Sequence, residues 1–316
     1  MGLRSSRSTL LFVAYGLLGA APFVGAVAGL PFFPPVLFAA FRIDIGAVLL
    51  LLVVVTRGGY WRPKTTTDIT GVLVTGILTL GGNIGLVFLG QQYITSATGS
   101  VVYSLAPLLT AVVAFFLLPG ERLGLWGGAG IVLGFIGAGI VANPDPSNLV
   151  TATNRGVVLV FLSTTSFAVG TVLTKYLDPQ LPTLTLTAWG LVVAAVFIHG
   201  LSLWRGETVG QVEWTTQAIL ALIGVGVLAT ALLYRVHFEL VTAIGATKTN
   251  LAYYAHPVST AVAGSLLLDE QITAATIAGS VVIFVGFVFI EWHHVRGYFK
   301  NYGGQVRLGS LSVVES

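Results

Sequence analysis

Two stretches of the chain combine hydroxyl, phenol and amide side chains with a proline inside an apolar run. In each stretch four residues share one face of a helix, because they follow one another at i, i+3, i+4 and i+7. They are Ser100, Tyr103, Ser104 and Pro107 in the first stretch, and Asn250, Tyr253, Tyr254 and Pro257 in the second. Such side chains hold a ligand by hydrogen bonding and stacking. The two faces therefore predict a binding cavity.

The prolines predict kinks in their helices. A proline inside a helix removes one backbone hydrogen bond and clashes with the preceding turn, and the freed carbonyl requires polar surroundings. Pro107 and Pro257 are therefore expected to act as kink and gating positions. Hydrogen bonds between helices explain the presence of Ser100 at least as well as contact with a substrate does. For Asn250, Tyr253 and Tyr254, a position in the cavity wall is favoured. Asn83, near the middle of another apolar run, is a candidate of the same kind.

Ionisable residues inside apolar runs are the other candidates for chemistry. Arg42 and Asp44 precede an apolar run of only twelve residues, Ile45 to Thr56, which is too short to cross a bilayer by itself. Each charge costs about 2.5–3.5 kcal/mol at mid-membrane, and at i and i+2 the two point to different sides of the helix. Both are candidates for a coupling group that exchanges protons: Asp44 is expected to face the cavity, whereas Arg42 could also snorkel outward.

His256 lies beside Pro257 and has an ordinary pKa near neutrality, so it is a further candidate for a coupling proton and for substrate contact. A buried neutral histidine bonded to a carbonyl is the alternative. The sequence has no cysteine, which excludes thiolate metal sites, and it shows no HExxH or aspartate-rich motif. We therefore expect no cofactor, no metal and no enzymatic activity.

The composition defines the elements that must position these residues. The chain is 55% hydrophobic and 9% charged, against about 25% charged residues in soluble domains. Ten apolar runs are long enough to span a bilayer. They cover residues 9–30, 35–56, 69–90, 96–118, 124–142, 156–176, 183–204, 217–237, 244–268 and 273–292. The sequence therefore predicts an all-α polytopic membrane protein of ten transmembrane helices, with a polar tail over residues 293–316.

The distribution of Lys and Arg predicts the orientation. With a cytoplasmic N-terminus, twelve cations lie inside, and Arg155 and Arg205 lie outside. Both termini are thus expected in the cytoplasm, in a multi-pass protein of the plasma membrane. The net charge of +3 is explained by these loops and requires no nucleic-acid partner.

The second half of the chain repeats the first at a distance of 149 residues. Ser96 recurs as Gly245, Glu121 as Glu270, and Gly130 and Gly137 as Gly279 and Gly286. Five helices per copy is an odd number, so residues 1–150 and 151–292 are expected to be inverted repeats. Glu121 and Glu270 each precede a glycine-rich helix and are interpreted as structural helix caps.

The two proline stretches with their flanks resemble a known family. TSATGSVVYSLAPLLTAVVAFFLLPGERL (Thr95 to Leu123) and AIGATKTNLAYYAHPVSTAVAGSLLLDEQI (Ala243 to Ile272) look like the fourth and ninth helices of EamA-type drug/metabolite transporters. The resemblance implies ten helices in two inverted halves and the movement of small polar or amphipathic metabolites, often as export.

The expectation is a secondary transporter that works by alternating access, as an exporter or exchanger. Its partners are a small-molecule substrate and the lipid bilayer. Coupling to protons and the oligomeric state stay open. The alternatives are a receptor or scaffold that does not transport, and an intramembrane enzyme.

Overall fold

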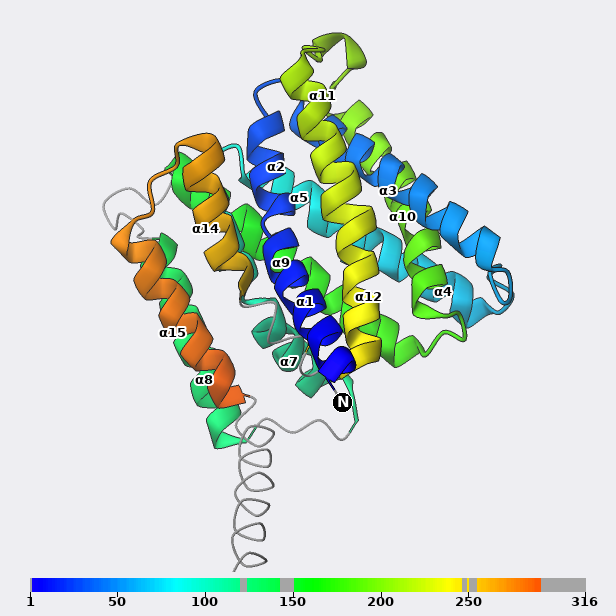
Figure 1. Cartoon of the computed structure of the whole chain (residues 1–316), viewed down its shortest axis with the longest axis horizontal. Helices are drawn as coiled ribbons and strands as arrows, with labels where there is room; N and C mark the ends of the chain where they lie inside the picture. The colour runs from blue at the N-terminus through cyan, green and yellow to red at the C-terminus, as the bar shows by residue number, and fades with distance from the viewer. Residues whose placement is uncertain (1, 120–123, 143–150, 246–248, 250–254, 291–316) are drawn as a thin grey trace, which may run out of the picture.

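The structure, a computed structural model, describes residues 2–119, 124–142, 151–245, 249 and 255–290. Within these ranges all regular secondary structure is helical, and the helices lie side by side in one bundle (Figure 1). This architecture confirms the all-α membrane class expected from the composition.

Seven helical segments are long and apolar enough to cross a membrane. Two are single helices at the edge of the bundle, α3 (Pro35–Arg57) and α10 (Thr183–Trp204), and a third is α9 (Ala152–Leu177). The other four combine α1 (Gly2–Leu18) with α2 (Ala21–Gly29), α4 (Thr66–Val74) with η1 (Thr75–Gly82) and α5 (Asn83–Gly90), α6 (Ser96–Tyr103) with α7 (Ala106–Leu117), and α11 (Thr216–Ile223) with η3 (Gly224–Leu232) and α12 (Leu233–Ile244).

Three shorter apolar helices coincide with the remaining expected spans: α8 (Leu125–Ala142), α14 (Ala255–Leu268) and α15 (Ala274–Ile290). Each of the ten apolar runs thus contains helix over its described residues. Because three of these helices are short over the described residues, the ten-span arrangement stays a prediction.

Several spans are interrupted at their middle. The chain leaves helical geometry between α6 and α7, just before Pro107, which lies in the first turn of α7, where its missing N–H leaves no helical bond unmade. The break lies where the sequence predicts a kink, and the kink and gating role of Pro107 stays a prediction. A break that the sequence analysis missed separates α1 from α2 at Gly19 and Ala20, ahead of Pro22. Pro257 is buried in the first turn of α14.

Two spans contain a π-helical segment, in which backbone bonds run from i to i+5. These segments are η1 and η3, and they begin 149 residues apart, at Thr75 and Gly224. Both copies of the repeat therefore depart from α-helical geometry at the same place.

The packing of α8 along α15 depends on glycine. A Cβ atom at Gly137 would lie 2.7 Å from the carbonyl of Gly279, and one at Gly286 would lie 2.6 Å from the carbonyl of Gly130. The two helices run antiparallel on one side of the bundle (Figure 1). The missing side chains of these glycines let the two backbones approach closely, as is common between helices in membranes.

Glu270 caps a helix, but not the one expected. Its two carboxylate oxygens accept hydrogen bonds from the backbone N–H and the hydroxyl of Ser96, at 2.8 and 2.6 Å, so it caps α6 in the other half of the chain. The start of α15 is capped instead by Thr273, whose hydroxyl accepts from the N–H of Thr276 at 3.1 Å. The expectation fails because α15 begins four residues after Glu270, beyond the reach of its side chain.

Two buried carboxylates missed by the sequence analysis act in the same way. Glu207 accepts from the N–H of Leu37 at 2.7 Å and so caps α3. Asp68 accepts from the N–H groups of Gln180 and Leu181, at 2.9 and 3.2 Å, ahead of α10. The Tyr60 phenol donates to Asp68, and this bond raises the pKa of Tyr60. Each carboxylate ties together two spans that lie far apart in the sequence.

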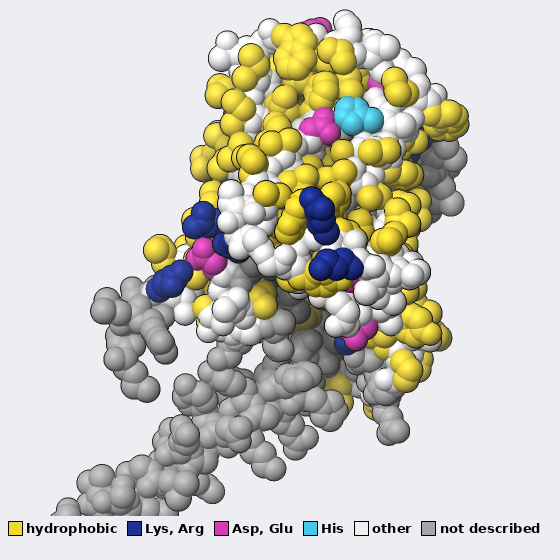
Figure 2. All heavy atoms as spheres, turned by 90° about the vertical axis from the view of Figure 1, so that its right-hand side faces the viewer, with side chains coloured by type: hydrophobic (Ala, Val, Ile, Leu, Met, Phe, Trp, Pro, Cys, Tyr) yellow, Lys and Arg dark blue, Asp and Glu magenta, His cyan; other side chains and the backbone are white. Residues whose placement is uncertain are grey.

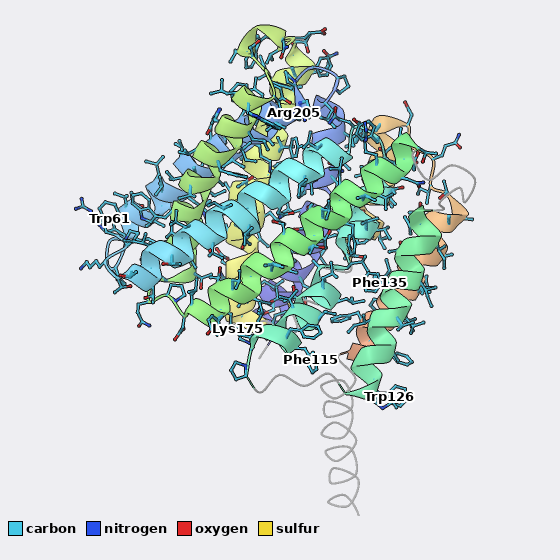
Figure 3. All side chains as sticks on the ribbon, turned by 180° about the vertical axis from the view of Figure 1, so that it is seen from behind. Trp61, Phe115, Trp126, Phe135, Lys175 and Arg205 are labelled. Atoms are coloured by element: carbon cyan, nitrogen blue, oxygen red, sulfur yellow. The ribbon has the colours of Figure 1, made fainter. Side chains whose placement is uncertain are left out.

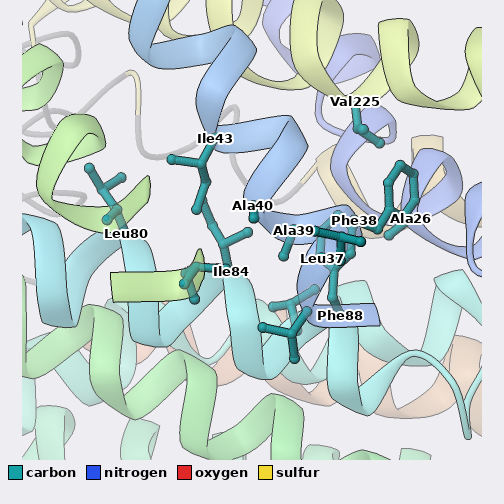
Figure 4. Packing of buried hydrophobic residues seen from close by; sticks show 14 of the residues in the cluster. Ala26, Leu37, Phe38, Ala39, Ala40, Ile43, Leu80, Ile84, Phe88 and Val225 are labelled. Atoms are coloured by element: carbon teal, nitrogen blue, oxygen red, sulfur yellow. The ribbon is translucent and has the colours of Figure 1, made fainter. Parts of the chain in front are cut away.

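The largest apolar cluster surrounds the N-terminal half of α3. Phe38 stacks on Phe33 at 4.5 Å and meets the ring of Phe88 at 5.1 Å. Figure 4 shows aliphatic side chains of the same cluster, among them Leu37, Ile43 and Ile84. Other aromatic side chains point away from the bundle, as Figure 3 shows for Phe115 and Phe135. A dry interior and an apolar exterior are both expected of a protein whose solvent is lipid.

Candidate functional site

A cavity of about 150 Å³ lies near the middle of the spans. Its lining includes four residues that the sequence analysis singled out, Arg42, Asn83, Tyr103 and His256. They come from α3, α5, α6 and α14, so both halves of the chain contribute. The structure thus brings together side chains that are as much as 214 positions apart in the sequence.

Asn83 is the centre of a small polar network. It directly follows the π-helix η1, and its side-chain amide donates to Tyr103 Oη at 3.0 Å and to the carbonyl of Thr79 at 3.1 Å. Its carbonyl oxygen accepts from the hydroxyl of Ser163, on α9, at 2.8 Å. These bonds fix the amide and the phenol at the cavity wall.

Arg42 lies at the cavity and does not snorkel to the membrane surface, since only 6% of the residue is exposed. Its Nε donates to Thr230 Oγ1 at 3.3 Å, and its Nη2 donates to the carbonyl of Ala229 at 3.4 Å. Both acceptors belong to the π-helix η3. The guanidinium carbon also lies 5.7 Å from the centre of the Phe88 ring. All of these partners are electrically neutral.

His256 forms an aromatic wall with residues that the sequence analysis missed. The ring of Tyr15 lies 5.0 Å from the ring of His256 and 5.3 Å from that of His237, and all three line the cavity. The ring of His256 occupies the space where a side chain at Gly19 would be. Because Gly19, at the break between α1 and α2, has no side chain, the ring of His256 has room in the cavity wall.

Asp44 does not face the cavity, contrary to expectation. Its carboxylate lies 2.9 Å from His199 Nε2 on the outer surface, with 41% of the Asp44 side chain exposed. Figure 2, which shows the face formed by α3 and α10, displays a histidine beside an acidic side chain among hydrophobic ones. Two positions along a helix turn the side chain by about 200°, so Asp44 must face outward once Arg42 faces inward.

Ser100 is also absent from the cavity lining. It is buried, and its hydroxyl donates to the carbonyl of Ala97 in its own helix at 2.9 Å. Ser104 makes the equivalent bond to Val101 at 2.6 Å. A serine that bonds to its own helix has little need of a ligand. Four further predicted residues lie outside the described part of the chain: Asn250, Tyr253, Tyr254 and Glu121.

A second hollow, of about 820 Å³, lies between α1, α3 and α12 at the end where the chain starts. We call it the basic groove, because Arg7, Arg57 and Arg235 line it with a single acid, Glu239. Glu239 accepts from Arg235 at 3.3 Å, as the i, i+4 spacing predicts, and from Arg7 at 3.2 Å. The groove was not predicted, since it depends on how the helices are splayed.

Several cavity residues had a weak signal in the sequence. Tyr15 stands four residues before the Gly19 break, and Tyr234 and His237 lie on one face of α12 at i and i+3. Gly19 and Pro22 mark the helix break near Tyr15, but no feature of the sequence shows which way the side chains of Tyr15 and His237 point. Among the described residues, no group of three or more acidic or histidine side chains is placed to hold a metal ion.

A family model describes almost the whole chain. The model of the EamA-like transporter family matches residues 6–143 and again residues 154–292. The chain belongs to the EamA-like transporter family. The resemblance seen in the two proline stretches is thereby confirmed, and the family indicates a multi-pass membrane transporter of small molecules and not an enzyme.

Relatives in bacteria and plants are similar to the chain over most of its length. The chain is 28% identical to the uncharacterized transporter YvbV of Bacillus subtilis (strain 168), over 92% of this chain and 93% of that protein. It is 25% identical to the WAT1-related protein At3g02690, chloroplastic, of Arabidopsis thaliana, over 83% of this chain and 64% of that protein. A solved crystal structure shares the fold with a TM-score of 0.64 at 20% identity, covering 92% of this chain and 98% of that one.

Proposed function

We propose that this member of the EamA-like family is a secondary transporter of a small polar or amphipathic metabolite. It works by alternating access as an exporter or exchanger, with the central cavity as its substrate site. The observation that carries the proposal is the cavity itself, where Arg42, Asn83, Tyr103 and His256 meet from both halves of the chain.

Two inverted five-helix halves, over residues 1–150 and 151–292, form the moving parts. The glycine contacts between α8 and α15 support this arrangement. Gly130 contacts Gly286, and Gly137 contacts Gly279. In the repeat Gly130 corresponds to Gly279 and Gly137 to Gly286, so each contact is the repeat equivalent of the other. Such a pair of equivalent contacts is what a twofold axis between the two halves produces.

Three other observations support the repeat. The π-helices η1 and η3 occupy equivalent places, and the family model matches each half separately. The neighbours also correspond, since α10 packs on η1 as α3 packs on η3. A substrate site at the junction of inverted repeats near mid-membrane is the common design of secondary transporters.

The two sides of the bundle differ in a way that supports alternating access. The basic groove lies on the side that the Lys and Arg distribution predicts to be cytoplasmic, together with Lys175, whereas Arg205 lies at the opposite end (Figure 3). Towards that opposite end the apolar cluster around Phe38 and Phe88 is densely packed. We interpret this conformation as one that opens to the cytoplasm and is closed to the outside.

Proton coupling would require a titratable group at the cavity. His256 keeps this role as a candidate because it lines the cavity, whereas Asp44 loses it because it faces outward. Pro107 and Pro257 remain the proposed hinge positions, next to the middle of their spans.

The proposal is tested by flux measurements on purified protein in liposomes, with a panel of labelled metabolites and with or without an imposed proton gradient. At least one compound should move faster than in empty liposomes, and Tyr103→Phe should reduce its flux. The control is Ser100→Ala, on the same helix but away from the cavity. A panel in which no compound moves would refute the proposal.

A further inference from the structure

We propose that the central cavity binds a small organic anion, whose negative group pairs with Arg42. This inference rests on the proposed function, because it names the substrate class of the same cavity. The anion's body is apolar and about as large as one aromatic ring.

Within the part of the chain that the structure describes, no acidic side chain pairs with Arg42. A guanidinium stays protonated in proteins, and a buried charge is costly unless it is paired. The nearest acid to Arg42 along the chain, Asp44, is paired with His199 on the outer face.

The other acids of the described spans are also engaged elsewhere. Asp68 accepts bonds from Tyr60 and from the backbone ahead of α10, and Glu239 is shared by Arg7 and Arg235. The remaining acidic residues of the sequence fall outside the ten apolar runs, apart from Glu291 at the end of the last run. The cation at the cavity therefore lacks a protein counter-ion at its own depth.

The geometry of Arg42 leaves room for an anionic ligand. Its two hydrogen bonds measure 3.3 and 3.4 Å, longer than the roughly 2.7–2.9 Å of a guanidinium bonded to a carboxylate. They use two of its five N–H donors. A carboxylate in the cavity would give this cation shorter bonds and a charge of opposite sign.

The rest of the wall defines the body of the ligand. Aromatic side chains from four spans line the cavity: Tyr15, Phe23, Tyr103, Phe167 and Tyr234. A cavity of about 150 Å³ is the size that holds a benzene ring. The polar groups of Asn83 and His256 lie in the same wall and allow one or two hydrogen bonds. An anionic group on a single ring matches this lining.

The basic groove adds an approach route for the same class of ligand. Three arginines and one glutamate leave it with a formal charge of +2. A cleft of one charge sign between low-dielectric walls raises the local concentration of ions of the opposite sign. The groove would thus raise the rate at which anions arrive, without setting how tightly Arg42 holds them.

The test uses three probes that share one body and differ in charge: 3-phenylpropanoate, 3-phenylpropanamide and 3-phenylpropylamine. Binding to the purified full-length protein in detergent is measured by calorimetry in a zwitterionic buffer without other carboxylates. The carboxylate should bind at least about tenfold more tightly than the amide, which corresponds to about 1.4 kcal/mol, and the amine should bind least. Arg42→Gln should abolish this preference, and Arg42→Lys should keep part of it.

Two variants are matched controls. Asp44→Asn changes a charge on the same helix but outside the cavity, and Arg57→Gln removes a cation of the basic groove. Both should keep the preference for the carboxylate. If Arg42→Gln does not fold, the preference in the wild type and its partial retention in Arg42→Lys decide the question.

Three results would overturn the inference. The first is a wild-type protein that binds the amide or the amine as tightly as the carboxylate. The second is a preference that depends on Arg57 and not on Arg42. The third is complete displacement by chloride with no difference between phenylpropanoate and acetate, which would indicate a site for simple inorganic ions.

The outcome is separable from that of the proposed function. Transport of an amine or a neutral compound, without binding of anions, would support the proposed transport function and refute the proposed anion site. Binding of the carboxylate through Arg42, without flux of any compound, would support the proposed anion site and refute the proposed transport function.

Discussion

The side-chain amide of Asn83 donates a hydrogen bond of 3.0 Å to the phenol oxygen of Tyr103 and so joins the third span to the fourth at the cavity wall. Ser163, from the second half of the chain, donates to the same amide group at 2.8 Å. The polar wall is therefore shared by both halves, and movement of one half against the other must change it.

Removal of the phenol oxygen tests this wall. Tyr103→Phe keeps the ring that packs against Phe23 at 5.6 Å and deletes only the acceptor of the Asn83 bond. We expect flux to fall about two- to tenfold while the protein stays folded, since one hydrogen bond contributes about 0.5–1.5 kcal/mol. Flux into proteoliposomes measures the effect. Ser100→Ala should keep wild-type flux, and an equal loss in both variants would contradict a specific role for Tyr103.

The fit of His256 against the helix break predicts that Gly19 cannot be replaced. A Cβ atom at Gly19 would overlap the imidazole ring of His256, so Gly19→Ala must displace that ring. We expect a loss of about 1–3 kcal/mol in stability and a loss of flux, measured by thermal unfolding in detergent and by transport. Gly200→Ala is the control, because nothing lies within 4 Å of its added Cβ. Unchanged unfolding of Gly19→Ala would refute the packing described.

Glu207 is predicted to be a structural carboxylate. Glu207→Gln keeps the shape but weakens the bonds to the N–H groups of Val36 and Leu37, of which the shorter is 2.7 Å. Hydrogen bonds to a charged group contribute about 1.5–3 kcal/mol, so a clear drop in the unfolding temperature is expected. Glu213→Gln, at an exposed acid six positions away, should have no effect. Similar unfolding temperatures for the two variants would show that α3 is not capped by Glu207.

The orientation can be tested directly because the chain has no cysteine. Lys64→Cys and Thr208→Cys each place a single thiol on an exposed loop, at opposite ends of the bundle. In intact cells a membrane-impermeant maleimide should label Thr208→Cys and not Lys64→Cys. In inside-out vesicles the labelling should reverse. The opposite pattern would mean that the termini are outside.

Much of the fold could be predicted because its signals are local. Each apolar run contains a helix, and the break before Pro107 follows from the geometry of the proline ring. The π-helices were not predictable, since no composition distinguishes η1 or η3 from an α-helix. The caps by Asp68 and Glu207 join residues more than 100 positions apart, which sequence spacing alone cannot show.

The site was predicted in part for the same reason. The spacing of Arg42 and Asp44 showed that they face different sides of a helix, but only the neighbouring helices decide which side is inside. The partner of Asp44 lies 155 positions away, at His199. Tyr15 and His237 became visible only when the rotation of their helices was known. Asn83, Tyr103 and His256 were found because polar groups inside apolar spans are rare.

Alternating access is tested most directly by a single cysteine at Val87, a buried residue of the cavity wall. In intact cells a small impermeant thiol reagent should reach Val87→Cys from the extracellular side. In inside-out vesicles the same reagent should reach it from the cytoplasmic side, and a transported substrate should slow both reactions. Modification from one side only, or from neither, while the loop cysteines at positions 64 and 208 react normally, would contradict a cavity that opens in turn to the two sides of the membrane.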